Sequence, residues 1–186
     1  MTPRSQKAQE YRLIAAGSGG QGVLTIGKLI STAVLREGSQ VTYLPAYGSE
    51  VRGGTTSCHI VVSPERILSP VVEKPDSLIL LNQASFERFS SLLRKGVLLI
   101  INTSLVKAAK CPDGATVIEV PATDRAVEMG SIQAANMLML GAFTAASGLC
   151  RTETMRQAIQ EALRTPRKEV IELNLRAFDE GARSAS

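Results

Sequence analysis

The amino-acid sequence predicts an α/β protein: a three-layer α/β/α fold with a Rossmann-like, mostly parallel sheet, a short β-hairpin insertion and C-terminal helices. An apolar run at residues 11–16 leads directly into a glycine-rich turn at 17–22 and then into helical periodicity. Continuous aliphatic runs at 77–81 and 97–101 are typical of parallel strands buried on both faces. The last third of the chain has the spacing of helices.

The first unit is a strand, a glycine loop, a helix and a second strand. Residues 11–16 read as a buried strand, and residues 23–34 are apolar at helical spacing until a polar, glycine-ended turn at 36–38. A second strand covers 40–44 and ends at Pro45. This order predicts the opening of a parallel sheet with a right-handed crossover.

The next segment is expected to make the sheet mixed. Residues 56–62 alternate between polar and apolar side chains, which indicates a strand. The short segment 66–69 follows a turn at Pro64, so we expect it to pair back on this strand as a hairpin.

The remaining elements alternate between strands and helices, with a helix start at Thr123 and Asp124 and a cap at Ser131. The strands are 77–81, 97–101 and 116–120; the helices are 86–93, one from Ile132, 153–163 and 166–178.

Length and composition bound the domain organisation. A chain of 186 residues fits one hydrophobic core, so we expect residues 11–186 to form a single domain after a disordered polar tail at 1–10. The tail lacks the apolar segment of a secretory signal, and the apolar stretch 134–149 is too short and too polar for a membrane span.

Charge and cysteine usage exclude several functions. The net charge of +4 comes from scattered basic residues, whereas a nucleic-acid surface needs a basic stripe. Cys58, Cys111 and Cys150 lie far apart without a C-x-x-C pair, which argues against zinc, clusters and disulfides. We therefore expect a cytoplasmic protein that binds neither nucleic acid nor membranes.

The glycine loop at 17–22 satisfies G-x-G-x-x-G between a strand and a helix. Three interpretations stay open: a dinucleotide site, a site for another phosphate or anion at the helix N-terminus, and close packing of strand and helix. A dinucleotide site also needs an acid after the second strand, where this chain has Leu44 and Pro45. Glu37 has a suitable separation but lies before that strand.

A second glycine-rich segment at 47–54 follows the second strand, so both loops should share the carboxyl edge of the sheet. Arg52, beside two glycines, could bind a carboxylate or phosphate; the alternative is an ordinary surface loop. His59 has no orienting acid nearby in the sequence and is interpreted as structural, and Asn136 as a satisfied buried amide. No complete active site is visible.

The two segments together resemble the gamma subunit, or gamma domain, of 2-oxoacid:ferredoxin (acceptor) oxidoreductases, the family of the pyruvate, 2-oxoglutarate and ketoisovalerate oxidoreductases. The motifs are G-x-G-G-Q-G at 17–22 and Y-G-x-E-x-R-G-G at 47–54, and the similarity continues through residues 57–62. Further matching residues are Pro70, Pro75, Asp76, Asn136, Leu140, Gly141, Ala142, Asn174, Ala177, Phe178 and Gly181.

The resemblance implies an enzyme that oxidatively decarboxylates a 2-oxoacid, reduces ferredoxin or a similar acceptor, and joins the acyl group to coenzyme A. Thiamine diphosphate and iron–sulfur clusters would lie in partner subunits, alpha and beta, with a ferredoxin-like delta subunit as a further candidate. This chain would bind no cofactor by itself and be inactive alone, with a contact to coenzyme A left open. The isolated chain is expected to form a homo-oligomer.

Carried over by position, the resemblance gives residues for ligand or interface contacts, with no catalytic residue and no metal ligand. They are Gly17, Gly19, Gly20, Gln21, Gly22, Tyr47, Glu50, Arg52, Gly53 and Gly54. The alternatives are a free-standing nucleotide- or coenzyme A-binding module and a purely structural subunit. The resemblance favours 2-oxoglutarate or a related 2-oxoacid without identifying the substrate, the acceptor or the stoichiometry.

Overall fold

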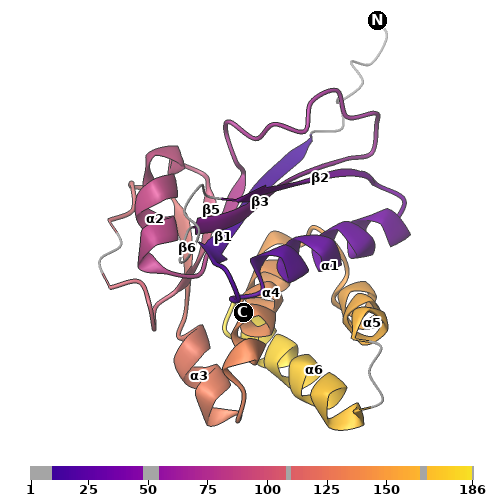
Figure 1. Cartoon of the computed structure of the whole chain (residues 1–186). Coiled ribbons are helices and arrows are strands. Elements are labelled where there is room, and N and C mark those ends of the chain that lie inside the picture. Colours follow the sequence, from indigo (N-terminus) through magenta and orange to yellow (C-terminus); the bar gives the residue numbers. More distant parts are fainter. Residues whose placement is uncertain (1–9, 48–54, 108–109, 164–166, 186) are drawn as a thin grey trace, which may run out of the picture.

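The computed structural model describes residues 10–47, 55–107, 110–163 and 167–185. Within these ranges the strands form one six-stranded sheet in the order β2-β3-β1-β4-β5-β6 (Figure 1). The strands are β1 (Tyr11–Ser18), β2 (Gln40–Tyr47), β3 (Thr55–Ser63), β4 (Ser77–Leu80), β5 (Leu98–Asn102) and β6 (Thr116–Val120). The helices are α1 (Val23–Arg36), α2 (Gln83–Phe89), η1 (Ser90–Leu92), α3 (Ala122–Glu128), η2 (Ile132–Ala134), α4 (Ala135–Ser147), α5 (Thr152–Ala162) and α6 (Lys168–Arg183).

Four of the strands form a parallel part of the sheet, but the first two strands of the chain do not open it as a pair, because among the described residues β2 pairs only with β3. β1 pairs with β4, β4 with β5, and β5 with β6, all in parallel. Leu78, Ile79 and Leu80 are fully buried, as expected for a strand with helices on both sides. The α/β fold class is confirmed, and the carboxyl ends of these strands meet at one edge of the sheet.

The sheet is mixed, but the predicted hairpin between 56–62 and 66–69 is wrong. Residues 66–69 form no strand. Instead β3 lies between β1 and β2 and is antiparallel to both, from Gln40 opposite Ser63 to Tyr47 opposite Thr56. The eight residues of β2 offer a long ladder to β3, whereas the short segment after Pro64 packs Ile67 on the smaller core and leaves Leu68 87% exposed.

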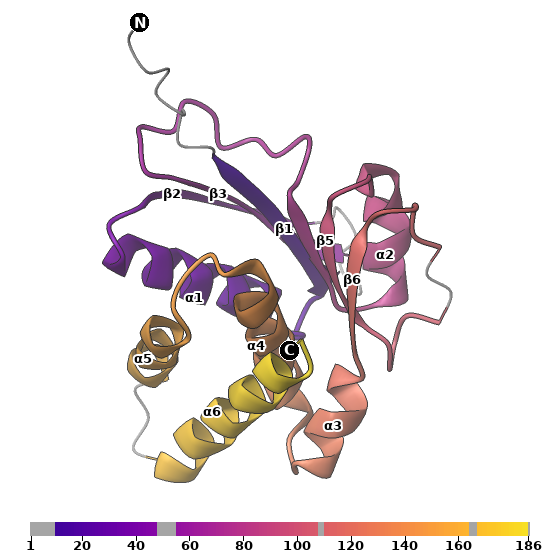
Figure 2. The ribbon, with the colours of Figure 1, turned by 180° about the vertical axis from the view of Figure 1, so that it is seen from behind.

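The layers on the two faces of the sheet are unequal. α1, α4, α5 and α6 lie on one face, and α2 covers the other (Figure 2). The larger core joins the first group of helices to the sheet through residues such as Leu13, Ile30 and Phe143, and the smaller core contains Phe86 and Phe89 of α2. Ser131 is the N-cap residue of the 3-10 turn that begins at Ile132, as predicted, but its hydroxyl donates to Gln133 Oε1 and makes no capping bond.

α4 is buried along most of its length because α6 packs directly across it. The crossing depends on two glycines. A Cβ atom at Gly141 would lie 2.8 Å from the backbone nitrogen of Ala182, and closer still to the carbonyl oxygen of Phe178. A Cβ atom at Gly181 would lie 2.7 Å from the carbonyl carbon of Leu138. Backbone meets backbone here, so neither helix can yield by moving one side chain.

Replacement of Gly181 by Ala should lower the free energy of unfolding by about 3 kcal/mol, because the added methyl group forces the two helices apart. Urea denaturation of the purified chain measures this. The matched control is Gly19→Ala, where a Cβ atom would meet nothing within 4 Å. Equal stability of the two variants would contradict the close crossing.

Candidate functional site at the carboxyl edge of the sheet

The glycine loop is closed by its own glutamine. β1 ends at Ser18 and α1 begins at Val23, and the turn between them places Gly20 and Gly22 at φ angles of 88° and 76°. These values favour glycine. The carboxamide oxygen Oε1 of Gln21 accepts a hydrogen bond of 2.6 Å from the backbone N–H of Ser18. A loop N–H group that a phosphate could use is therefore already bonded within the loop.

Asn82 ties this loop to the neighbouring parallel strand. It directly follows Leu81 at the end of β4 and caps α2 in a reciprocal capping box with Ser85. Its Nδ2 donates to Ser18 Oγ at 2.6 Å and to Gln21 Oε1 at 2.9 Å. One side chain thus fixes the start of α2 and the conformation of the glycine loop together.

Two glycines of the motif are required by close packing. A Cβ atom at Gly17 would lie 2.8 Å from Gln21 Oε1 and 3.0 Å from Leu81 Cβ. A Cβ atom at Gly22 would lie 2.8 Å from Asn136 Cγ and closer to its Nδ2. Around Gly19 and Gly20 there is open space. Packing of strand and helices therefore accounts for the first and last glycine of G-x-G-x-x-G.

Asn136 on α4 is the side chain against which Gly22 packs, and it is 8% exposed. The prediction that it is a satisfied buried amide is wrong for one atom, because its Oδ1 has no hydrogen-bond partner among the described residues. A buried acceptor without a partner is unfavourable, so Asn136 Oδ1 is a polar atom of this contact that the described residues leave unsatisfied.

Glu37 does not reach the glycine loop. It is the C-cap of α1, and its Oε1 accepts hydrogen bonds from the backbone N–H and the Nε of Arg151 at 3.0 and 3.2 Å, at the start of α5. A hydrogen bond from the Thr154 side chain is the largest cause that lowers the pKa of Glu37, with Arg151 adding to it. The acid that a dinucleotide ribose would need is engaged elsewhere in the fold.

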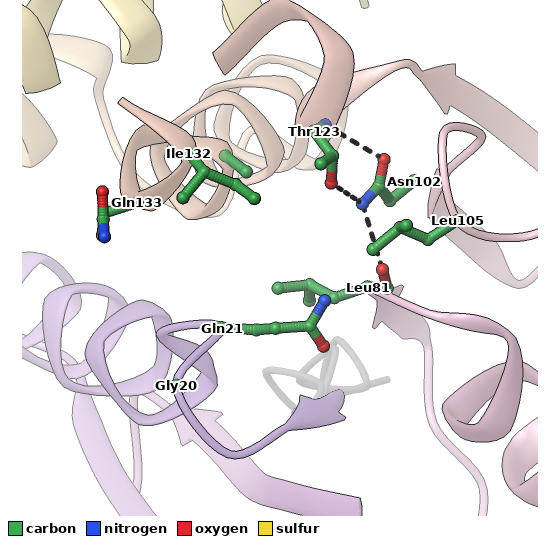
Figure 3. Close-up of a pocket in the computed structure, with 9 residues that line it drawn as sticks. Gly20, Gln21, Leu81, Asn102, Leu105, Thr123, Ile132 and Gln133 are labelled. Atoms are coloured by element: carbon green, nitrogen blue, oxygen red, sulfur yellow. Dashed lines mark hydrogen bonds between the residues drawn. The ribbon is translucent and has the colours of Figure 1, made fainter. Parts of the chain in front are cut away.

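A cavity of about 200 Å³ opens beside the loop, at the carboxyl ends of β4 and β5 (Figure 3). Its lining residues are Gly20, Gln21, Leu81, Asn102, Leu105, Thr123, Ile132, Gln133 and Ala135. Asn102 is 1% exposed and its Nδ2 donates to the carbonyl oxygen of Leu81 at 3.0 Å and to Thr123 Oγ1 at 2.9 Å. These bonds hold the wall of the cavity in place.

Gly20 and Gln21, which the sequence suggests as ligand or interface residues, lie in this wall. Asn102 and Thr123 of the wall, and Asn82 beside the loop, were not among the suggested site residues. A signal was present, because each of the two asparagines ends an aliphatic strand at the edge where open α/β sheets place their sites. Asn102 and Thr123 approach each other only because β5 pairs with β6, and no local sequence pattern predicts that pairing.

The second glycine-rich segment can be placed at one residue only. Tyr47 ends β2 opposite Thr56, and Thr55 lies opposite Ser18 of β1, so Tyr47 and the glycine loop share one edge of the sheet. Tyr47 is 70% exposed. The predicted residues Glu50, Arg52, Gly53 and Gly54 lie outside the described residues.

His59 and Cys58 on β3 have structural surroundings. The His59 ring packs edge-on against Phe89, with 6.4 Å between ring centroids, and burial lowers its pKa, with a further contribution from Arg88. Burial raises the pKa of the Cys58 thiol to about 12, which disfavours a thiolate. Within the ranges that the structure describes, no group of three His, Cys, Asp or Glu side chains could hold a metal ion.

These features define a Rossmann-like domain whose glycine loop is braced from inside and whose carboxyl edge carries an uncharged cavity. Among known families, the one described as pyruvate ferredoxin/flavodoxin oxidoreductase matches residues 12–184, and the chain belongs to this family. The resemblance found in the two motifs is confirmed. No helix among the described residues combines the length and apolar composition that crossing a membrane requires.

In one relative the matching region is part of a much longer polypeptide, and in another it is nearly the whole polypeptide. The chain is 39% identical over 176 residues to ketoisovalerate oxidoreductase subunit VorA of Methanothermobacter marburgensis, with 94% of this chain aligned but only 36% of VorA. It is 32% identical to 2-oxoglutarate synthase subunit KorC of Methanocaldococcus jannaschii, covering 96% of this chain and 94% of KorC. The chain thus spans about a third of one relative and nearly all of another.

Solved structures share the fold. The gamma subunit of a keto/oxoacid ferredoxin oxidoreductase from Geobacter sulfurreducens aligns with a TM-score of 0.80 and 26% identity, over 94% of this chain and 98% of that one. A 2-oxoglutarate:ferredoxin oxidoreductase from Magnetococcus marinus aligns with a TM-score of 0.88 and 23% identity, over 97% of this chain and 31% of that one.

The Gly22–Asn136 contact gives a double-mutant test. Gly22→Ala should destabilise the chain more than Gly20→Ala, because both place alanine at a positive φ but only the first meets Asn136. We expect about 1–2 kcal/mol for Gly20→Ala and at least about 1 kcal/mol more for Gly22→Ala. Adding Asn136→Ala to Gly22→Ala should recover part of the loss. Strict additivity in chemical denaturation would contradict the contact.

Glu37→Gln should lower the melting temperature near neutral pH, because the lowered pKa of Glu37 means that its carboxylate stabilises the fold. This contribution is present above the unfolded-state pKa and is lost as pH falls through the lower folded-state pKa. Melting curves of both proteins should therefore converge in acid. A constant difference from about pH 7 to about pH 3 would show that the carboxylate charge is not involved.

Proposed function

We propose that this chain is the gamma subunit of a 2-oxoacid:ferredoxin (acceptor) oxidoreductase, which catalyses the coenzyme A-dependent oxidative decarboxylation of a 2-oxoacid. The observation that carries the proposal is the match along almost the whole chain to KorC, a subunit of 2-oxoglutarate synthase. VorA supports it from a second enzyme of the same type. The relatives together make 2-oxoglutarate and 2-oxoisovalerate the first substrates to assay.

In this proposal the reacting cofactors are held by partner subunits, alpha and beta, with a ferredoxin-like delta subunit as a further partner. Thiamine diphosphate supplies the decarboxylation chemistry there and iron–sulfur clusters carry the electrons. Nothing in the described part of this chain fits a cluster, since Cys58, Cys111 and Cys150 are separate free thiols on different segments. Free thiols also agree with a reducing cytoplasm.

Within the described ranges, the glycine loop and the lining of the adjacent cavity offer no charged side chain to the phosphates of coenzyme A. One backbone donor of the loop, the Ser18 N–H, is already bonded to Gln21. We therefore assign the chain's contact with coenzyme A to Arg52, which follows Tyr47 in the sequence and belongs to the second glycine-rich motif. A guanidinium group binds phosphate with two parallel hydrogen bonds. Coenzyme A is chosen as the ligand because the structure of the Magnetococcus enzyme contains bound 2-oxoglutarate, coenzyme A and succinyl-CoA.

Purification of the chain from its native cells under mild, oxygen-free conditions tests the proposal. We expect larger subunits to accompany it and the complex to reduce a dye with a 2-oxoacid in a coenzyme A-dependent reaction, while the separated chain is inactive. The assay should compare 2-oxoglutarate, 2-oxoisovalerate and pyruvate. A lone protein without such activity that binds NAD, FAD or coenzyme A in calorimetry would instead identify a free-standing binding module.

In the assembled enzyme, Arg52→Ala should raise the KM for coenzyme A by about tenfold or more, because a charge-assisted phosphate contact is lost. The KM for the 2-oxoacid should stay unchanged. Arg52→Lys should recover only part of the effect, since an ammonium group cannot bind in the bidentate manner. Unchanged kinetics for both variants would leave the second loop a packing role.

A further inference from the structure

We infer that the cavity at the carboxyl edge receives a large uncharged side chain, aromatic or aliphatic, from the larger partner subunit and so anchors the subunit interface. This inference rests on the proposed function, because it needs that partner. In this interface Leu105 and Ile132, which lie outside both glycine-rich motifs, contact the partner side chain.

The size and lining of the cavity favour one side chain over a cofactor. Its volume of about 200 Å³ is below the range of about 300–1,000 Å³ that is usual for small-molecule pockets. An apolar cavity of about 150 Å³ is already large enough for benzene. Leu81, Leu105, Ile132 and Ala135 supply apolar walls, and none of the lining residues within the described ranges is charged. A phosphate or carboxylate would lose its hydration there without gaining a counter-charge.

The polar groups of the wall are largely engaged already. Asn102 is bonded to Leu81 and Thr123, and Gln21 Oε1 accepts from Ser18 and Asn82. Figure 3 shows the Gln21 carboxamide with its oxygen turned away from the cavity and its nitrogen on the side of Leu81. An apolar occupant therefore leaves these bonds intact, and the Gln21 nitrogen can donate to a backbone carbonyl of the entering segment.

The mouth of the cavity is bordered by apolar side chains that remain in contact with water. Leu105 is 38% exposed and Ile132 is 55% exposed, and they stand on opposite sides of the opening in Figure 3. Tyr47, which is 70% exposed, lies farther along the same edge. Buried apolar anchors surrounded by further contacts are typical of protein–protein interfaces.

The partner segment is expected to belong to the same enzyme. In VorA, which is similar to this chain over 36% of its own length, the remainder of the polypeptide is covalently joined to the homologous region. The rest of the VorA polypeptide is thus tethered next to the homologous region, so a permanent apolar contact between the two is available. In an enzyme whose gamma subunit is a separate polypeptide, the same contact must form without a covalent link.

Charge placed at the mouth should weaken assembly. Leu105→Asp and Ile132→Asp are compared with wild type by measuring the Kd for the purified partner subunits in a sedimentation assay. We expect Kd to rise about tenfold or more for each, because a carboxylate would be buried against an apolar surface. Leu68→Asp is the matched control: this leucine is 87% exposed in the segment after β3, at the opposite end of the strands, and should leave Kd unchanged.

A filling variant keeps the test valid if an aspartate variant does not fold. Ala135→Leu occupies the cavity from within and adds only apolar surface, so the chain should remain folded by circular dichroism while Kd rises. If wild type assembles and Leu105→Asp, Ile132→Asp and Ala135→Leu all assemble equally well, the inference is wrong and the proposed function stands. If wild type itself binds no partner subunit, the proposed function fails first.

Methyl NMR of the isolated chain tests two other possible occupants of the cavity, coenzyme A and a second copy of this chain. Coenzyme A added alone should leave the signals of Leu81, Leu105, Ile132 and Ala135 unshifted, and specific shifts at these methyl groups would overturn the inference in favour of a cofactor pocket. Concentration-dependent shifts of the same methyl groups without any addition would identify a second copy of this chain as the occupant.

Discussion

The hydrogen bonds that join Gln21, Ser18 and Asn82 are the constraint on which the carboxyl edge depends. They fix the turn between β1 and α1, orient the first turn of α2 and place Gln21 and Gly20 in the wall of the cavity. The brace keeps one backbone donor of the loop, the Ser18 N–H, bonded within the loop. The first and last glycines of the motif serve close packing.

This arrangement shows how the glycine motif of a Rossmann-like fold can serve internal packing. Gly17 and Gly22 allow β1, α1 and α4 to approach closely. The Asn136 side chain of α4 packs against Gly22, directly before the first residue of α1. Glu37 stabilises the start of α5. Gly17, Gly22 and Glu37 are thus used for internal contacts of the domain, and in the proposed function the carboxyl edge is where partner subunits bind.

Much of the fold could be predicted because strands such as 77–81 carry continuous aliphatic runs and α1 has a clear period and a glycine stop. The position of β3 between β1 and β2 could not, because pairing order depends on ladders between distant segments such as Tyr11 and Val62. The site was predicted in part: the glycine loop and Tyr47 do share an edge. The bonds of Asn102 and Asn82 are tertiary contacts with no local signature.

The central claim is that the carboxyl edge of this chain is a protein interface and that its glycine loop stays closed. An electron cryo-microscopy structure of the assembled native enzyme, prepared with coenzyme A and substrate, tests it most directly. The account predicts that Gln21 still accepts from the Ser18 N–H and that a partner side chain lies between Leu105 and Ile132. A nucleotide phosphate bound in the glycine loop with Gln21 displaced, or an edge open to solvent, would contradict it.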